Sequence, residues 1–126
     1  MKKLFVVFIF ASILGCVSTD SRPVGDKSPV FYYFHSENCP HCVVAKPFID
    51  SLEKKYPQVE FRNLEVTRDL DARDLYKAKV EELKIERGGV PLFVMGKDFV
   101  IGFKKDSHED KIEKMIARQL KNLRTE

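Results

Sequence analysis

Two cysteines separated by two residues form the motif Cys39-Pro40-His41-Cys42. On a helical turn, residues three apart share a face and lie about 5–6 Å apart, a separation that a disulfide can span. A fully extended chain would hold the same cysteines roughly 10 Å apart, too far to bond. The spacing therefore favours a pair that opens and closes with little backbone movement, which indicates redox chemistry.

Each residue of the motif has an expected role. Cysteine reacts as the thiolate, and helix N-termini and positive charges lower the pKa of a thiol. We expect Cys39, at the helix start, to be the nucleophile, and Cys42, one turn deeper, to be the resolving thiol. Pro40 suits a first helical turn because its missing N–H group would have no partner there. His41 can donate to a thiolate or carry charge near it.

The residues around the motif predict alternating strands and helices. A buried strand over residues 30–34 leads into a helix over residues 39–56, with Pro47 expected to kink that helix. The pattern then predicts strands at residues 59–62, 92–95 and 99–103, a helix over residues 69–85, and a last helix from Asp106 or Ser107. The order β-α-β-α-β-β-α predicts an α/β fold with a four-stranded mixed sheet flanked by helices.

The first sixteen residues differ from the rest of the chain. A basic start precedes an apolar run over residues 4–14. Such a run reaches only about 16 Å as a helix, short of the roughly 30 Å hydrocarbon core of a bilayer, so it indicates a secretory signal. Gly15-Cys16 resembles the lipobox of bacterial-type lipoproteins, whose cysteine is acylated. Residues 1–16 are thus expected to be a lipoprotein signal, with a plain signal peptide or an uncleaved anchor as alternatives.

The chain has three cysteines, an odd number that would leave a stray thiol in an oxidising compartment. If Cys16 carries a lipid, only the pair of the motif remains. Residues 17–28 are polar, contain Pro and Gly and lack periodicity, which is typical of a flexible tether. Residues 29–126 are expected to form the folded domain.

Composition and residue types argue against several other functions. The chain has 22 basic and 19 acidic residues and no basic run, so no nucleic-acid partner is expected. A zinc site would need two ligands besides the cysteines, and only His35, His41 and His108 are present beyond carboxylates. We therefore expect no metal or other cofactor. A carrier that holds copper(I) on the two thiolates remains an alternative from another class.

The chain resembles the thioredoxin superfamily over residues 29–124. The resemblance rests on a strand followed by the cysteine motif, Pro47 in the helix, Gly89-Val90-Pro91 before the third strand, and the closing hairpin and helix. The Pro-His dipeptide is that of the bacterial periplasmic disulfide oxidants. The resemblance implies a cis bond between Val90 and Pro91, in a substrate-binding loop that lies against the cysteines and pairs with an extended client segment.

Three features depart from the family pattern. Tyr33 stands six residues before Cys39, where thioredoxins and the periplasmic oxidants usually have a buried acid. Asn38 precedes Cys39, and the chain has no tryptophan. A single helix links the second and third strands, so the helical insertion of the oxidants is missing. A compact, glutaredoxin-sized face without a glutathione site is expected.

These observations predict a monomeric, extracytoplasmic thiol–disulfide oxidoreductase, held at a membrane by lipid on Cys16. Its partners would be secreted proteins with thiols or disulfides and a membrane redox partner that resets the pair. Oxidation of clients is favoured because a stabilised thiolate favours the reduced pair. A reductase or isomerase of the same fold, a thiolate metal-binding module, and a cytoplasmic glutaredoxin-like protein with an N-terminal anchor are the alternatives.

Overall fold

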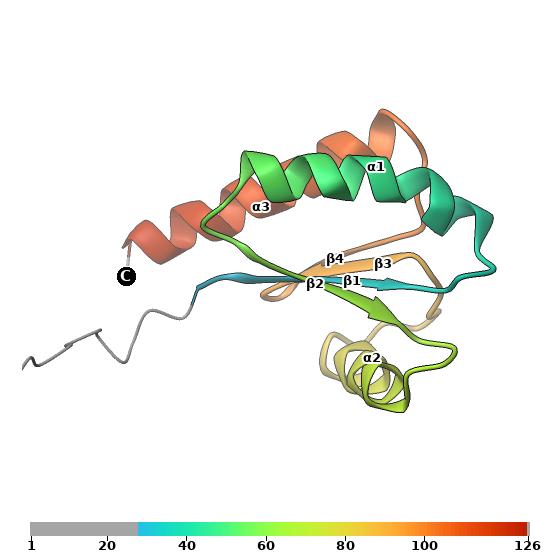
Figure 1. Cartoon of the computed structure of the whole chain (residues 1–126). Helices are drawn as coiled ribbons and strands as arrows, with labels where there is room; N and C mark the ends of the chain where they lie inside the picture. The colour runs from blue at the N-terminus through green and yellow to red at the C-terminus, as the bar shows by residue number, and fades with distance from the viewer. Residues whose placement is uncertain (1–27, 126) are drawn as a thin grey trace, which may run out of the picture.

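A four-stranded mixed β-sheet forms the centre of the fold (Figure 1). Strand β1 (Val30–His35) pairs in parallel with β2 (Glu60–Glu65) and antiparallel with β3 (Leu92–Met95), and β3 pairs antiparallel with β4 (Asp98–Ile101). The order across the sheet is β2-β1-β3-β4, with β1 and β3 inside. The predicted α/β class and mixed sheet are confirmed.

A computed structural model describes residues 28–125 of the chain. The expected signal over residues 1–16, with its Cys16, and residues 17–27 of the expected tether lie outside this part. Within residues 28–125, no helix combines the length and the apolar character that a membrane span needs.

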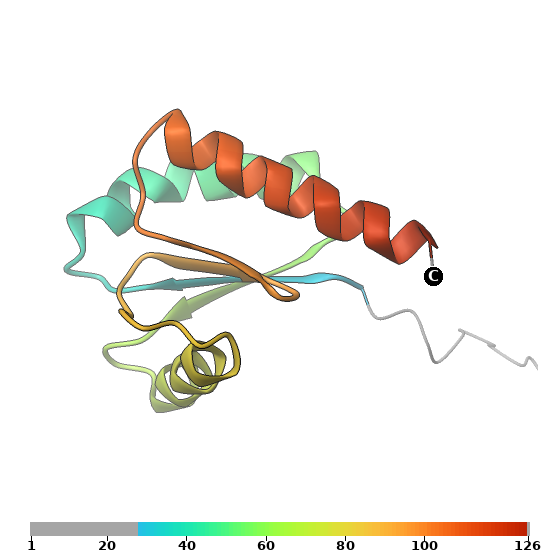
Figure 2. The same cartoon turned by 180° about the vertical axis from the view of Figure 1, so that it is seen from behind.

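Helices cover both faces of the sheet (Figures 1 and 2). Helices α1 (Pro40–Lys55) and α3 (Ser107–Thr125) lie on one face, and α2 (Leu70–Glu82) lies on the other. Helix α1 follows β1 directly, so the cysteine motif at its start lies beyond the carboxyl end of β1. In open α/β sheets this end carries the functional groups.

Apolar side chains fill the space on both faces of the sheet. Phe31, Tyr33 and Phe93 belong to the cluster beneath α1 and α3, whereas Phe34 and Leu92 belong to the cluster that packs against α2. Successive side chains of a strand point to opposite faces, which separates the two clusters. All four residues of β3 are buried because this strand is covered on both faces.

Three strands end at other residues than the sequence predicts, and the smallest difference is in β1, which continues one residue further, to His35. Strand β2 runs to Glu65 rather than ending at residue 62. Its pairing with β1 continues along the whole strand, although β2 lies at the edge of the sheet and has several polar residues. Strand β4 ends at Ile101 because Gly102 adopts a φ of 76°, which breaks the extended backbone, while its N–H still bonds to the Pro91 carbonyl oxygen at 2.7 Å. A positive φ of this kind is open to glycine at no steric cost.

The helix ends are set by local hydrogen bonds. The Asp69 carboxylate accepts the N–H of Ala72 at 3.1 Å and caps α2. That helix ends before residue 85 because Lys84 adopts a left-handed φ of 52°. The Glu109 carboxylate accepts the N–H of Asp106 at 3.3 Å, which is the reciprocal half of a capping box at the start of α3.

Candidate active site

The cysteine motif forms the start of α1. Cys39 is the N-cap residue with an extended backbone, and Pro40 is the first residue of the helix. The Cα atoms of Cys39 and Cys42 are 5.2 Å apart, and the two sulfurs form a disulfide. The structure thus brings the two cysteines together on one helical turn.

The sulfur of Cys39 lies where a thiolate would be stabilised. It accepts a hydrogen bond from the backbone N–H of Cys42 at 3.2 Å. The positive end of the helix dipole adds to this effect, and the first turn of α1 contains no acidic residue that would oppose it. Cys39 is half-buried, whereas Cys42 is 3% exposed. A client sulfur can therefore reach Cys39 more readily than Cys42, with His41 exposed on the same turn.

The loop before β3 lies against Cys39. The Val90–Pro91 peptide bond is cis, and the Val90 carbonyl oxygen lies 3.6 Å from the Cys39 sulfur. The Pro91 side chain is buried, whereas Val90 is half-buried. The structure therefore places the two residues of the expected substrate-binding loop next to the cysteine that is the expected nucleophile.

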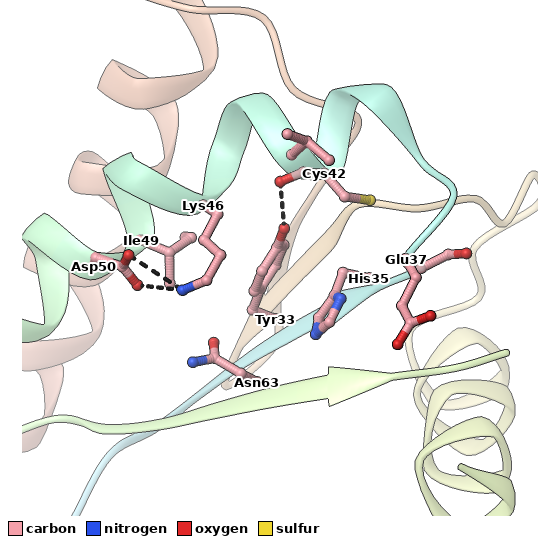
Figure 3. Close-up of a pocket in the computed structure, with 10 residues that line it drawn as sticks. Tyr33, His35, Glu37, Cys42, Lys46, Ile49, Asp50 and Asn63 are labelled. Atoms are coloured by element: carbon pink, nitrogen blue, oxygen red, sulfur yellow. Dashed lines mark hydrogen bonds and ion pairs between the residues drawn. The ribbon is translucent and has the colours of Figure 1, made fainter. Parts of the chain in front are cut away.

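Tyr33 lies beneath Cys42, at the position where the family resemblance implies an acid. Its hydroxyl donates to the backbone carbonyl oxygen of Cys42 at 2.9 Å (Figure 3). Burial and, to a smaller extent, the Asp50 carboxylate raise the pKa of Tyr33 to about 12. The phenol therefore stays protonated at neutral pH and cannot take a proton from the Cys42 thiol.

A cavity of about 300 Å³ lies beside Cys42, between α1 and strands β1 and β2 (Figure 3). Its walls are Tyr33, His35, Ser36, Glu37, Cys42, Val43, Lys46, Ile49, Asp50 and Asn63. Exposed side chains such as Lys46 and Asn63 form part of these walls, so water can enter. A cavity of this size has room for several water molecules.

Three of these residues, His35, Lys46 and Asp50, are not among the site residues that the motif predicts. His35 follows Tyr33 by two positions in β1, so both point to the same face of the sheet, and their rings stack with centroids 5.0 Å apart. Lys46 and Asp50 follow Cys42 at intervals of four residues, which places them on one face of α1. These two periodicities are the signals in the sequence that assign each side chain to a face of its own element, whereas the cavity itself arises from the packing of α1 on the sheet.

Metal-binding side chains do not gather in the part of the chain that the structure describes. Within residues 28–125, no three His, Cys, Asp or Glu residues lie close enough together to hold a metal ion. His108 lies far along the chain from the motif and contacts the Gly102 carbonyl oxygen through Nδ1 at 3.0 Å. It therefore has a structural contact at the start of α3.

Solved structures of thioredoxins share this arrangement of strands and helices. Oxidised mitochondrial thioredoxin 3 from Saccharomyces cerevisiae is 24% identical, with a TM-score of 0.51 over 69% of this chain and 78% of that chain. Fasciola hepatica thioredoxin is 22% identical, with a TM-score of 0.52 over 68% and 79%. Oxidised thioredoxin O1 from Arabidopsis thaliana is 21% identical, with a TM-score of 0.53 over 68% and 76%.

At these identities the likeness concerns the fold. No family model matches the sequence, and no curated protein matches it. The chain has a thioredoxin-like α/β fold, as its sequence predicts, and carries a disulfide-forming cysteine pair at the start of α1.

Proposed function

We propose that this protein is a thiol–disulfide oxidoreductase that exchanges disulfides with client proteins through Cys39 and Cys42. One observation carries the proposal. The Cys39 sulfur accepts an N–H at the start of α1 and faces the Val90 carbonyl oxygen, while Cys42 lies buried one turn deeper. A disulfide that only stabilises the fold does not need one accessible and one buried sulfur. Disulfide exchange does, because one thiol must meet the client first and the other must resolve the mixed disulfide.

The oxidation of a client is a two-step exchange. A client thiolate attacks the Cys39 sulfur, so that a mixed disulfide forms and Cys42 leaves as a thiolate that takes up a proton. A second client thiolate then attacks the client sulfur of the mixed disulfide and releases Cys39 as a thiolate. The client loses two electrons and gains a disulfide, and the pair gains the same two electrons. Reduction of a client is the reverse sequence.

The surface around Cys39 suits an extended polypeptide. The backbone of Val90 borders the sulfur and can pair with a client segment as an added strand, which tolerates many sequences. The exposed side chains of Val43 and Val44 lie on the first turns of α1, close in the chain to the pair. We therefore infer that the clients are proteins with thiols or disulfides in extended segments.

The proposed direction is oxidation, because the backbone N–H of Cys42 and the N-terminus of α1 stabilise a Cys39 thiolate and hence the reduced pair. Equilibration with glutathione at pH 7 should give a potential near −120 mV, rather than the roughly −270 mV typical of thioredoxin. This redox potential is measured by alkylating the free thiols and quantifying the oxidised and reduced protein by mass spectrometry. The variant His41→Ala should lower the potential, since it removes an imidazole that can donate to the thiolate.

A potential near −270 mV would instead assign the protein as a reductase. A pair that does not exchange with glutathione at all would contradict the proposed function in either direction, and so would a pair that is locked in one redox state.

We further propose that the protein acts outside the cytoplasm, held at a membrane by a lipid on Cys16 and connected through residues 17–28. The basic and apolar start of the chain and Gly15-Cys16 support this proposal. Since each oxidation leaves the pair reduced, a membrane redox partner would have to reoxidise it. We propose that the protein itself works as a monomer.

Mass spectrometry of the mature N-terminus tests the proposed location. We expect a chain that begins at an acylated Cys16, and the variant Cys16→Ser should lose both the lipid mass and the membrane fraction. A chain that retains Met1 with an unmodified Cys16 would exclude lipidation and favour a protein with an uncleaved N-terminal segment.

A further inference from the structure

The resolving thiol must exchange a proton in every cycle of the proposed function. Cys42 attacks the mixed disulfide as a thiolate, and it takes up a proton when it is displaced. Its side chain is 3% exposed, and the nearest phenol, Tyr33, stays protonated at neutral pH. The cavity that Cys42 lines is therefore the route by which this proton can travel.

Most of the other charged groups around the cavity already have partners. The Lys46 ammonium bonds both carboxylate oxygens of Asp50, at 2.9 and 3.2 Å, and has no lone pair that could accept a proton. Glu37 forms an ion pair with Arg68 at 2.8 Å. These carboxylates are each balanced by a cation, which weakens them as proton acceptors.

Glu65 on β2 stands opposite His35 in the sheet register. Its carboxylate accepts the backbone N–H groups of Thr67 and Arg68 at 3.0 and 2.6 Å. Hydrogen bonds from the Thr67 hydroxyl and from these N–H groups lower the pKa of Glu65 to about 2. Glu65 is thus held as a carboxylate and is a poor base for a thiol.

His35 remains as the group in the cavity that can accept a proton at neutral pH. The dashed lines of Figure 3 join Tyr33 to Cys42 and Lys46 to Asp50, and none of them reaches the imidazole of His35. Burial lowers the pKa of His35, with Lys46 lowering it further and Glu65 and Glu37 raising it. The ring is therefore neutral near pH 7 and keeps a nitrogen lone pair.

We propose that His35 is the residue that exchanges protons with the Cys42 thiol through this cavity, an inference that rests on the proposed function. When Cys42 resolves a mixed disulfide, the neutral imidazole takes the thiol proton through water. In the proposed direction this step occurs when the redox partner reoxidises the pair. The Cys42 thiolate attacks the Cys39 sulfur, the disulfide between Cys39 and Cys42 forms, and the bond from Cys39 to the sulfur of the redox partner breaks. The partner leaves as a thiolate, and the imidazolium returns its proton to solvent.

Stopped-flow reaction of the reduced protein with dithio-bis-nitrobenzoate separates the two thiols. Attack by Cys39 releases one thionitrobenzoate at a rate that depends on the reagent concentration. Attack by Cys42 on the resulting mixed disulfide releases the second at a rate that does not. The full chain is used with Cys16→Ser, so that only the pair reacts. Because thionitrobenzoate leaves readily as an anion, the second phase reports on deprotonation of Cys42.

The variant His35→Gln should slow the second phase at pH 7 by at least about tenfold and leave the first phase within about twofold. The second-phase rate of the parent protein should level off above the pKa of the imidazole. In the variant it should rise about tenfold per pH unit until the thiol itself titrates. Free imidazole should restore the second phase in His35→Ala, since the cavity has room for it. Asn63→Ala, which alters an uncharged part of the cavity wall, is the matched control and should behave like the parent.

Equal second-phase rates in His35→Gln and the parent would overturn the proposal, as would an equal slowing of both phases or a failure of imidazole to rescue. A parent protein that releases only one thionitrobenzoate would overturn the proposed function itself, because Cys42 would then not resolve the mixed disulfide. The two failures are distinguishable. If only the proposal about His35 is wrong, the parent protein still releases the second thionitrobenzoate.

Discussion

Replacing Cys39 with serine is expected to abolish disulfide exchange, lowering its rate by about 10⁴-fold or more, as for the loss of a catalytic nucleophile. Replacing Cys42 with serine should have a different effect, because Cys39 remains able to react. The half-buried Cys39 sulfur is within reach of a client, whereas Cys42 is buried behind it. The variant Cys42→Ser should therefore capture clients as mixed disulfides and release them slowly.

Non-reducing gel electrophoresis followed by mass spectrometry measures this difference. Adducts through Cys39 should accumulate in Cys42→Ser, be absent from Cys39→Ser, and disappear on addition of a reductant. Cys16→Ser, which lies outside the exchange reaction, is the matched control for loss of a cysteine. Stoichiometric copper(I) on the parent, together with no adducts in Cys42→Ser, would instead identify a metal-binding module.

The variant Phe93→Ala is expected to reduce the free energy of unfolding by about 3–5 kcal/mol. Phe93 is completely buried in β3, and its ring centroid lies 5.3 Å from that of Tyr33, 6.3 Å from that of Phe31 and 6.2 Å from that of Phe103. Removing the ring leaves a cavity at the centre of the cluster beneath α1 and α3. In a domain of this size, each kcal/mol corresponds to a fall in Tm of about 4–8 °C.

Urea unfolding of the oxidised protein, followed by circular dichroism, measures the loss. The matched control is Phe99→Ala in β4, whose side chain is 41% exposed and should lose much less stability. Equal losses in the two variants would show that the Phe93 ring is not a central part of the core. Because Phe93 stacks on Tyr33, the variant should also loosen the contact between the Tyr33 hydroxyl and Cys42.

The local features of the site follow from neighbouring residues and could be predicted. The preference of Pro40 for a first helical turn determines where α1 begins. The spacing of Cys39 and Cys42 on that turn brings the two sulfurs within bonding distance. The periodicity of the following residues determines the helices, and the apolar run over residues 30–34 determines the central strand. These properties depend on hydrogen bonds and side-chain directions within a few residues, so they can be predicted from short segments of the sequence.

The exact ends of the strands depend on pairing partners and were harder to predict. Glu65 belongs to β2 because it pairs with His35 in a neighbouring strand, although its own type and neighbours favour a turn. Ile101 ends β4 because the next residue, Gly102, leaves the extended conformation with a φ of 76°, although its N–H still bonds to the Pro91 carbonyl oxygen across the hairpin.

The amino-acid sequence by itself determined the order of the elements, the position of the cysteine pair and the asymmetry between a helix-capping Cys39 and a deeper Cys42. Only the tertiary structure decided what surrounds that pair. It brings Val90 to Cys39 across 51 positions of the chain, directs the Tyr33 hydroxyl to the Cys42 carbonyl, and opens a cavity between His35 and α1. The physical reason is that these contacts arise from the pairing of β1 with β2 and β3 and from the packing of α1 on the sheet, which join residues distant in sequence.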